Sequence, residues 1–451
     1  MYIKNNDELL SHGNVELRKA AIEIINAGIR NADPYVKTKE LVSVEGKTLH
    51  VGENSFDLNY YTRIYVLGAG KATYPIAKAL DEVLGELITD GVVICKYGQE
   101  GTLEHQRMYH SSHPIPDENG YEACKELMKI ARQTVDTDIV FSISTGGSTS
   151  LMPYPVDGVT IEEKRQTGLV LLRSGANMWE MNYVRKHLTQ AKAGFLAKAI
   201  SPKAPIINLG VSDGIGQGLD QCVEPSVPDY SYFSDAQNVL TKYHLWEKVP
   251  ESVANYIRNG TPEQETPKDL SDRNIFNYLL LDVNKAVEGA NDKAKELGFN
   301  SVILSTFIEG ESREIGSMMA AISKEILNYD RPIARPAALI VGGESTQKIN
   351  IPNPGYGGPQ QQFSLGAAVW LRDTENIVIA GVDTDGTDGP TSNAGGMVDC
   401  STVEKADELG LNIFEYMDAF DDGVALKELG DVVITGATGT NVNDLKIALI
   451  G

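Results

Sequence analysis

The chain has 451 residues, of which 42% are hydrophobic, and a formal net charge of −22. This length exceeds what one ordinary hydrophobic core supports, so we expect two domains. The negative charge argues against nucleic acid as a partner, since nucleic-acid binding relies on Lys and Arg to neutralise phosphates, and the lack of an 18-residue apolar run argues against a membrane span.

The N-terminus and the cysteines favour a cytoplasmic protein. The first residues carry no basic segment followed by an apolar stretch, so we expect no secretory signal. The cysteines are far apart and form no CxxC pair, which is typical of buried thiols in a reducing compartment: Cys95, Cys124, Cys222 and Cys400.

The first part of the chain carries both helix and strand patterns. Residues 8–32 have apolar side chains at helical spacing, and residues 42–58 alternate around two glycines as a hairpin does. Residues 64–88 fit a strand, a loop and a helix. Thr160 and Glu163 form a capping box, which predicts the start of another helix.

The second part begins with a change in composition. Between residues 218 and 272 the strand patterns vanish and Pro, Gln, Asp and Asn accumulate, so we place the crossing between domains there. The resulting domains span residues 1–250 and 251–451. Further elements are expected as follows: helices at 182–188, 235–245, 273–298 and 311–328, a strand at 301–307, and a helix that starts with a Ser401–Glu404 capping box and ends at Gly410.

Six apolar, mostly β-branched runs end abruptly in Gly, Ser, Thr and Asp. Runs without alternation fit strands buried on both faces, which predicts an α/β fold with mainly parallel sheets covered by helices. Ligands of such sheets bind at the carboxyl ends of the strands. Small polar residues there favour a phosphate-handling enzyme. The runs cover residues 64–71, 139–148, 205–213, 338–346, 377–385 and 432–440.

The first run ends in Gly68-Ala-Gly70-Lys71, directly before a predicted helix. It is not a Walker A loop, and it fails the dinucleotide fingerprint because Thr73 replaces the third glycine. The pattern alone fits either an anion site or a tight packing turn. We favour the anion site because Lys71 at a helix N-terminus opposes the helix dipole, which a bound anion would offset.

The second run ends in Ser144-Thr-Gly146-Gly147-Ser148. No G-x-S-x-G elbow surrounds Ser148, so a backbone nest for a phosphate is favoured over a hydrolase nucleophile. The fifth run ends in Asp383-Thr-Asp385-Gly-Thr-Asp388. This loop fails the EF-hand template, and its carboxylates fit either Mg²⁺ beside substrate phosphates or a loop of Asx turns.

Two further groups have ordinary explanations. His105, His110 and His113 lack the spacing and the cysteine partners of a zinc site, so we do not expect one. The cations of Asn182-Tyr-Val-Arg185-Lys186-His187 fit either a ligand site or a solvated helix face.

Together these motifs resemble the MOFRL-type glycerate 2-kinases, some of which carry the older label hydroxypyruvate reductase. The resemblance covers nearly the whole chain. The motifs that carry it, in order, are His113-Pro-Ile-Pro-Asp117, Ser144–Ser148, Ser174-Gly-Ala, Asn182-Tyr-Val-Arg-Lys-His-Leu188, Lys192-Ala-Gly194, Ser212-Asp213, Gly343-Glu344, Thr384-Asp385-Gly-Thr-Asp388-Gly389 and Thr438-Gly-Thr-Asn441.

The resemblance implies a Rossmann-like N-terminal domain of the glycerate-kinase type and a C-terminal MOFRL-type domain, with an active-site cleft between them. It implies transfer of a phosphoryl group from ATP, with Mg²⁺, to the 2-hydroxyl of a small hydroxy acid, glycerate in the family. It further implies a functional role for Lys71. It leaves open whether the protein is a homodimer, and it implies neither nucleic acid nor membrane as a partner.

Roles for single residues follow from the motifs. Catalysis is assigned to Lys71, Arg185, Lys186 and Asp213. Substrate or phosphate binding is assigned to Gly70, Ser144, Gly146, Gly147, Ser148, Asn182, Lys192, Gly343 and Asp388. Mg²⁺ is assigned to Glu344 and Asp385.

The chain also departs from the family. The family's Gly-Gly-Arg-Asn-Gln-Glu segment here ends in Pro359, Gln360, Gln361 and Gln362, and Cys222–Ser226 replaces Ala-Ser-Gly-Pro-Thr. These changes predict an altered acceptor, with D-glycerate a poor one. An oxidoreductase that uses a nicotinamide cofactor and a catalytically silent metabolite-binding protein remain the alternative hypotheses.

Overall fold

The computed structural model describes residues 1–216 and 225–451, and the departure at Cys222–Ser226 lies mostly outside them. Chain contacts define two compact units. The central unit contains Pro34–Ser212 together with 225–280, and the terminal unit contains Met1–Asp33, Asp213–Gly216 and Leu281–Gly451. The contacts therefore divide the chain near residue 280 rather than 250, and the first 33 residues belong with the later part of the chain.

The central unit is built on a largely parallel sheet, as the uninterrupted apolar runs predict. Its strand order is β6-β5-β4-β7-β8-β9, and the pairings from β6 through β8 are parallel. The strands are β4 (Arg63–Ala69), β5 (Ile88–Lys96), β6 (Arg107–Ser111), β7 (Asp138–Thr145), β8 (Ile206–Val211) and β9 (Ile275–Leu281). The chain runs outward from β4 to β6 and then returns to place β7 on the other side of β4. The topological switch point therefore lies between β4 and β7.

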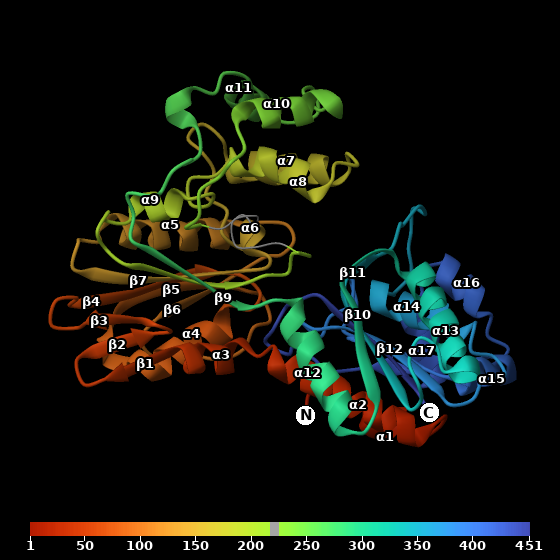
Figure 1. Cartoon of the computed structure of the whole chain (residues 1–451). Helices are drawn as coiled ribbons and strands as arrows, with labels where there is room; N and C mark the ends of the chain where they lie inside the picture. The colour runs from red at the N-terminus through yellow and green to blue at the C-terminus, as the bar shows by residue number, and fades with distance from the viewer. Residues whose placement is uncertain (217–224) are drawn as a thin grey trace. The chain divides into compact units, whose positions relative to one another are not determined.

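Helices and a small sheet complete the central unit (Figure 1). Helices α4 (Thr73–Leu84) and α5 (Glu118–Arg132) pack on the parallel sheet. A second apolar core joins α7 (Ile161–Leu172), α8 (Met178–Lys186), α10 (Phe233–Lys242) and α11 (Glu251–Arg258). The hairpin expected at 42–58 is confirmed and extended to three antiparallel strands, β1 (Val42–Glu45), β2 (Thr48–Val51) and β3 (Asn54–Asp57).

The terminal unit has a mixed sheet, so the prediction of a mainly parallel sheet is wrong for this unit. The order is β10-β11-β15-β12-β13-β14, in which β10 pairs with β11 in parallel and the other four pairings are antiparallel. The strands are β10 (Asn300–Glu311), β11 (Ala337–Thr346), β12 (Ile377–Asp383), β13 (Gly395–Val398), β14 (Val432–Val433) and β15 (Asp444–Ile450).

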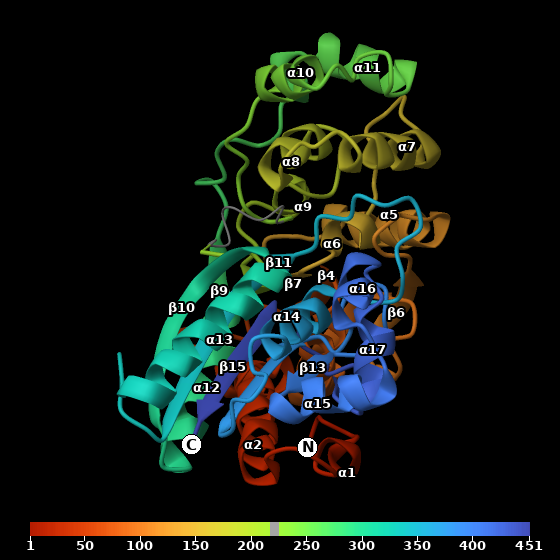
Figure 2. The same ribbon diagram turned by 90° about the vertical axis from the view of Figure 1, so that its right-hand side faces the viewer.

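Every antiparallel pairing of this sheet involves β13 or β15, two strands outside the six predicted runs, and the central one of the two is β15. All of its residues are buried, since it lies in the middle of the sheet and helices cover both faces (Figure 2). A continuous apolar run reports burial on both faces and does not report strand direction. Because β15 is antiparallel to both β11 and β12, those two strands still point the same way, and their carboxyl ends share one edge.

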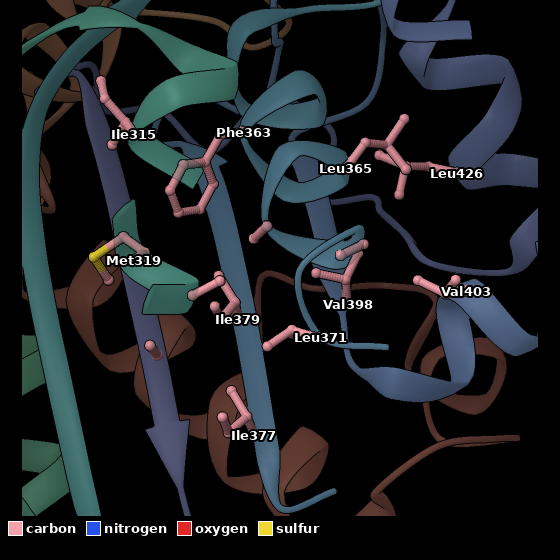
Figure 3. Close-up of a cluster of buried hydrophobic side chains, with 14 of the residues drawn as sticks. Ile315, Met319, Phe363, Leu365, Leu371, Ile377, Ile379, Val398, Val403 and Leu426 are labelled. Carbon is pink, nitrogen blue, oxygen red and sulfur yellow. The ribbon is translucent and has the colours of Figure 1, made fainter. Parts of the chain in front are cut away.

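Two apolar layers enclose the terminal sheet. One contains α13 (Ser312–Tyr329), α14 (Pro359–Ala368), α15 (Cys400–Leu409), α16 (Ile413–Asp418) and α17 (Asp422–Leu429). Figure 3 shows Ile315, Phe363 and Ile379 of this layer in one cluster. The other layer contains α2 (Val15–Asn31) and α12 (Val283–Glu296). The chain's first helices thus complete a core whose strands come after residue 300.

Several element predictions need correction. The helix expected over 8–32 is divided into α1 (Asn6–Leu9) and α2, because Asn14 caps α2 through the Leu17 N–H. The helix expected over 273–298 is strand β9 followed by α12. Helix α15 is capped by Asp399, which accepts from the Ser401 N–H, rather than by a Ser401–Glu404 box. The Thr160–Glu163 box and the end of α15 at Gly410 are confirmed.

Candidate functional site

The loops after β4 and β7 meet at the switch point of the central sheet. The Lys71 N–H donates to the Gly146 carbonyl at 2.8 Å. Gly70 has a φ of +142°, and a Cβ there would lie 2.0 Å from the Thr145 Oγ1. Only glycine permits this approach. We call Gly70–Ala72 and Thr145–Ser148 the switch-point loops.

Thr145 ties these loops together. Its buried hydroxyl accepts from the Ala72 N–H at 3.1 Å, directly before α4 begins. The Thr145 side chain thus satisfies a backbone N–H at the start of a helix.

Lys71 and His113 both lie beside Gly147. A Cβ on Gly147 would be 2.9 Å from the His113 Cδ2 and 3.2 Å from the Lys71 Cγ, and Gly147 has a φ of +83°. The sequence offered His113 only as a zinc ligand or a motif residue. The structure places it next to Lys71, where an imidazole can donate to a bound anion.

Lys192 brings a second cation to the same loops. Its side chain is 2% exposed, and the ammonium donates to the Ser148 hydroxyl and, at 3.3 Å, to the Thr149 hydroxyl. Ser148 begins the short helix α6 (Ser148–Leu151). The predicted phosphate-binding residues Gly146, Gly147, Ser148 and Lys192 are thus close together. Ser144 is the buried end of β7 beneath them.

Lys164 was missed by the sequence reasoning. Its ammonium donates to the Leu188 carbonyl at 2.6 Å. Desolvation lowers the pKa of Lys164 to about 7, with repulsion from Lys192 and Arg185 as further causes. It follows the α7 capping box, where a lysine usually belongs to a solvated face, so the sequence carried no signal for it.

The cations of α8 divide into two kinds. Arg185 is half-buried, its guanidinium contacts the Met178 Sδ at 3.8 Å, and burial lowers its pKa. The Lys186 ammonium instead donates to Asp229 at 3.0 Å, and the Asp229 side chain is 1% exposed. Lys186 therefore forms a buried ion pair, which gives it a structural partner that the sequence could not indicate. Asn182 lies half-buried on the same helix.

In the terminal unit, three segments meet at the carboxyl edge of the sheet. The Asn441 amide donates to the Asp213 carboxylate at 3.2 Å, and the Asn443 amide donates to the Asp213 carbonyl. The Thr384 hydroxyl donates to the Asn443 carbonyl at 2.6 Å. We call Asp213, Asp383, Asp385, Asn441 and Asn443 the acidic edge.

The carboxylates of the Asp383 loop make the local hydrogen bonds of Asx turns. Asp383 accepts from the Asp385 N–H at 3.0 Å, and Asp385 accepts from the N–H and hydroxyl of Thr387 at 2.8 and 2.6 Å. Glu344 is exposed at the end of β11. The described residues contain no group of three His, Cys, Asp or Glu placed to hold a metal. The donors at this edge are oxygens, the type that Mg²⁺ prefers.

Asp388 does not lie open to a ligand, contrary to its assignment as a substrate-binding residue. Its carboxylate is 1% exposed and accepts from the Gln360 and Gln361 N–H groups at 3.0 and 2.9 Å and from the Gln361 amide at 2.8 Å. Asp388 therefore caps the start of α14. Burial raises the pKa of Asp388 to about 7.

Gly343 and the glutamines also have structural surroundings. Gly343 has a φ of +144°, and a Cβ there would lie 2.2 Å from the Ile308 carbonyl. Gln360, Gln361 and Gln362 are buried, and their amides donate to Ser345, Thr391 and the Met417 carbonyl. They do not face a ligand, so only the half-buried Pro359 remains as support for an altered acceptor.

Comparisons with known proteins cover almost the whole chain. Residues 337–444 match the MOFRL family, and residues 20–258 match a domain of unknown function, DUF4147. The chain is 40% identical to the D-glycerate 2-kinase of Thermotoga maritima, over 96% of this chain and 98% of that protein. It is 36% identical to the glycerate 2-kinase of Pyrococcus horikoshii, over 97% and 98%.

Solved structures agree with these matches. The crystal structure of the glycerate kinase from Thermotoga maritima superposes with a TM-score of 0.82 at 38% identity, and covers 97% of this chain and 100% of that one. Among the described residues, no helix has the length and apolar character needed to cross a bilayer.

Proposed function

The chain belongs to the glycerate 2-kinase family, and from that membership we propose that it transfers the γ-phosphoryl group of ATP to the 2-hydroxyl of glycerate or a closely similar hydroxy acid. The near full-length identity to two proteins named as glycerate 2-kinases supports the reaction class. The observation that carries the proposal for this chain is the set of switch-point loops, where Lys71, Lys192 and the Gly146-Gly147 backbone lie together.

Phosphoryl transfer depends on position and charge more than on covalent chemistry by the protein. In the proposal, Lys71 neutralises charge on the transferred group and the Gly146-Gly147 loop donates backbone N–H groups to phosphate oxygens. Lys192 holds Ser148 and Thr149, and so fixes the shape of that loop. Arg185 and Asn182 are assigned to the carboxylate of the acceptor, which a guanidinium matches well.

Carboxylates at the carboxyl edge of the terminal sheet are assigned to the acceptor hydroxyl and to the metal ion. Asp213 orients the acceptor hydroxyl and accepts its proton, with its carboxylate held by Asn441. Asp385 and Glu344 would hold Mg²⁺, because hard cations of this kind commonly bind one or two carboxylates together with water and substrate phosphates. The ion, when bound, would neutralise charge on the nucleotide phosphates.

The proposal includes a cytoplasmic location and nucleotide and hydroxy acid as partners, without nucleic acid. A homodimer stays an expectation, and analytical ultracentrifugation of the purified chain tests it.

A coupled assay tests the function directly. The purified protein is incubated with ATP, Mg²⁺ and each of a panel of hydroxy acids, and ADP formation is measured together with the position of phosphate on the product by NMR. Formation of a 2-phosphorylated hydroxy acid is expected. Reduction of hydroxypyruvate with oxidation of a nicotinamide cofactor, in the absence of ATP, would support the oxidoreductase instead. Loss of both activities with tight metabolite binding would support a silent homologue.

A further inference from the structure

One large aromatic side chain stands exposed at the carboxyl edge of the terminal sheet. Phe307, on β10, is 67% exposed, whereas its neighbours Leu304 and Ile308 pack against the core of the unit. An exposed phenyl ring gains nothing for folding. Its position at the ligand edge of the sheet therefore calls for a functional explanation.

The strand is irregular at this point. The pairing of β10 with β11 shifts register between Ile303 and Ser305 and again between Ser305 and Ile308, so two irregularities enclose Phe307. The Phe307 N–H donates to the Ser305 hydroxyl at 3.0 Å rather than to the sheet. Bulges next to active sites commonly redirect a side chain. Here the irregularity turns one ring away from the packed layers.

The ring lies beside residues already assigned to the reaction. A Cβ on Gly216 would be 2.6 Å from the Phe307 Cε1, and Gly216 has a φ of +61°. Gly216 is three residues after Asp213. In the neighbouring strand, Glu344 is opposite Glu309, two residues after Phe307, which corresponds to about 7 Å along the strand. The ring therefore packs against the segment that follows Asp213, and it lies two residues along the paired strands from a proposed metal ligand.

The chemistry of the two substrates decides which of them suits this ring. A small hydroxy acid is anionic and hydrogen-bonding, and offers no flat apolar face. A purine base has such a face, and stacking on aromatic side chains is a general mode of base recognition. We propose that Phe307 is the platform on which the adenine base of ATP stacks, with the phosphates directed toward Glu344 and Asp385. This inference rests on the proposed function.

Nucleotide binding by matched variants tests it. Phe307→Ala should weaken ADP binding, measured by calorimetry, by about tenfold or more, as expected for loss of one base–aromatic stack. Phe307→Tyr should restore it. Binding of inorganic tripolyphosphate, which lacks a base, should be unchanged in Phe307→Ala. The melting temperature should also stay unchanged, because the ring is mostly exposed.

Trp370, an aromatic side chain 55% exposed elsewhere in the same unit, provides the control, and Trp370→Ala should bind ADP normally. Equal losses for ADP and tripolyphosphate, or no loss for ADP, would overturn the inference while leaving wild-type kinase activity intact. If the wild-type chain neither binds ATP nor phosphorylates any hydroxy acid, the proposed function itself is wrong.

Discussion

The switch-point loops and the acidic edge carry side chains of opposite charge. In the central unit, glycines allow the two loops to approach within hydrogen-bond distance, and Lys71 and Lys192 supply positive charge. In the terminal unit, Asp213, Asp383 and Asp385 supply carboxylates that amides and hydroxyls hold in place. Although the net charge of the chain is −22, the switch-point loops bring two lysines, Lys71 and Lys192, close together. In the proposal, anion binding falls to residues of the central unit, and metal or hydroxyl binding falls to residues of the terminal unit.

The cationic half gives the largest expected effect. Lys71→Met should lower kcat by two orders of magnitude or more, the scale typical for loss of one preorganised electrostatic group. Its melting temperature should change little, since Lys71 lies half-buried in a loop. Steady-state kinetics and calorimetry measure the two quantities.

Lys203→Met is a matched control, because the Lys203 side chain is 79% exposed and lies in a loop. Normal turnover in Lys71→Met would make Lys71 a packing residue and would remove the contrast between the two regions.

The neighbouring cations of α8 should separate into a ligand residue and a structural one. Arg185→Met should reduce kcat/KM for the acceptor by roughly 10–100-fold, the cost of a lost charged hydrogen bond, with little change in stability. Lys186→Met should remove the 3.0 Å partner of the buried Asp229, leave only Lys268 at 3.9 Å, and cost about 3 kcal/mol. This corresponds to a drop in melting temperature of about 4–10 °C.

Thermal denaturation and acceptor kinetics of both variants give the comparison. The reverse result, an unstable Arg185→Met and an inactive but stable Lys186→Met, would exchange the two assignments.

The acceptor test addresses Pro359, where the resembling family carries arginine. Proline offers neither charge nor an N–H, so we expect D-glycerate to be a poorer acceptor than a hydroxy compound of four to six carbons. Pro359→Arg should raise kcat/KM for D-glycerate by about tenfold, since arginine forms bidentate contacts with carboxylates and phosphoryl oxygens. The exposed Pro352→Arg serves as control. Efficient D-glycerate phosphorylation by the wild type contradicts this prediction.

The smallest effect concerns pH and two acids buried in the terminal unit, Asp422 and Asp388. Burial raises the pKa of Asp422 to about 8, well above the ordinary value of about 3.9. Between about pH 4 and pH 8 the folded state keeps a proton that the unfolded state has released, so stability must fall as pH rises through this window. Asp388 contributes in the same direction.

Asp422→Asn removes the Asp422 contribution. Its melting temperature should exceed that of wild type by a few degrees at pH 8.5, and the difference should vanish near pH 4.5. Asp418→Asn, at a side chain 72% exposed, should show no such pH dependence. A constant difference at both pH values would contradict the linkage.

The sequence predicted strands better than side-chain partners. Each apolar run became a strand, and the glycines at 70, 147 and 343 have positive φ angles. The strand β15 was not among the predicted runs, and its burial on both faces would in any case look the same for either direction. The long-range pairs of the site were equally hidden, since 43 residues separate Lys186 from Asp229 and 27 separate Gln361 from Asp388.

The presence of a residue in a family motif led to predictions of ligand contact that the burial of several side chains does not support. Asp388 and Gln360 to Gln362 belong to segments that resemble the family, yet their side chains satisfy each other inside the terminal unit. Lys164 shows the opposite error: a lysine on an apparently polar helix turned out to be desolvated beside Lys192. In both cases the burial of the side chain decides its surroundings, and residue type alone does not predict that burial.

The central position of β15 sets the order in which the protein can be completed on the ribosome. The β11 and β12 strands have no direct pairing and meet only through β15, which is synthesised after every other strand of the sheet. Helix α2, made early, packs on this same sheet. The central unit can form its sheet once residue 281 has emerged from the ribosome. The terminal unit cannot complete its sheet until the last residues are synthesised, so its early helix remains without a full partner until then. The acidic edge is therefore assembled last, and nascent chains that stop before residue 444 are the species most exposed to aggregation and proteolysis.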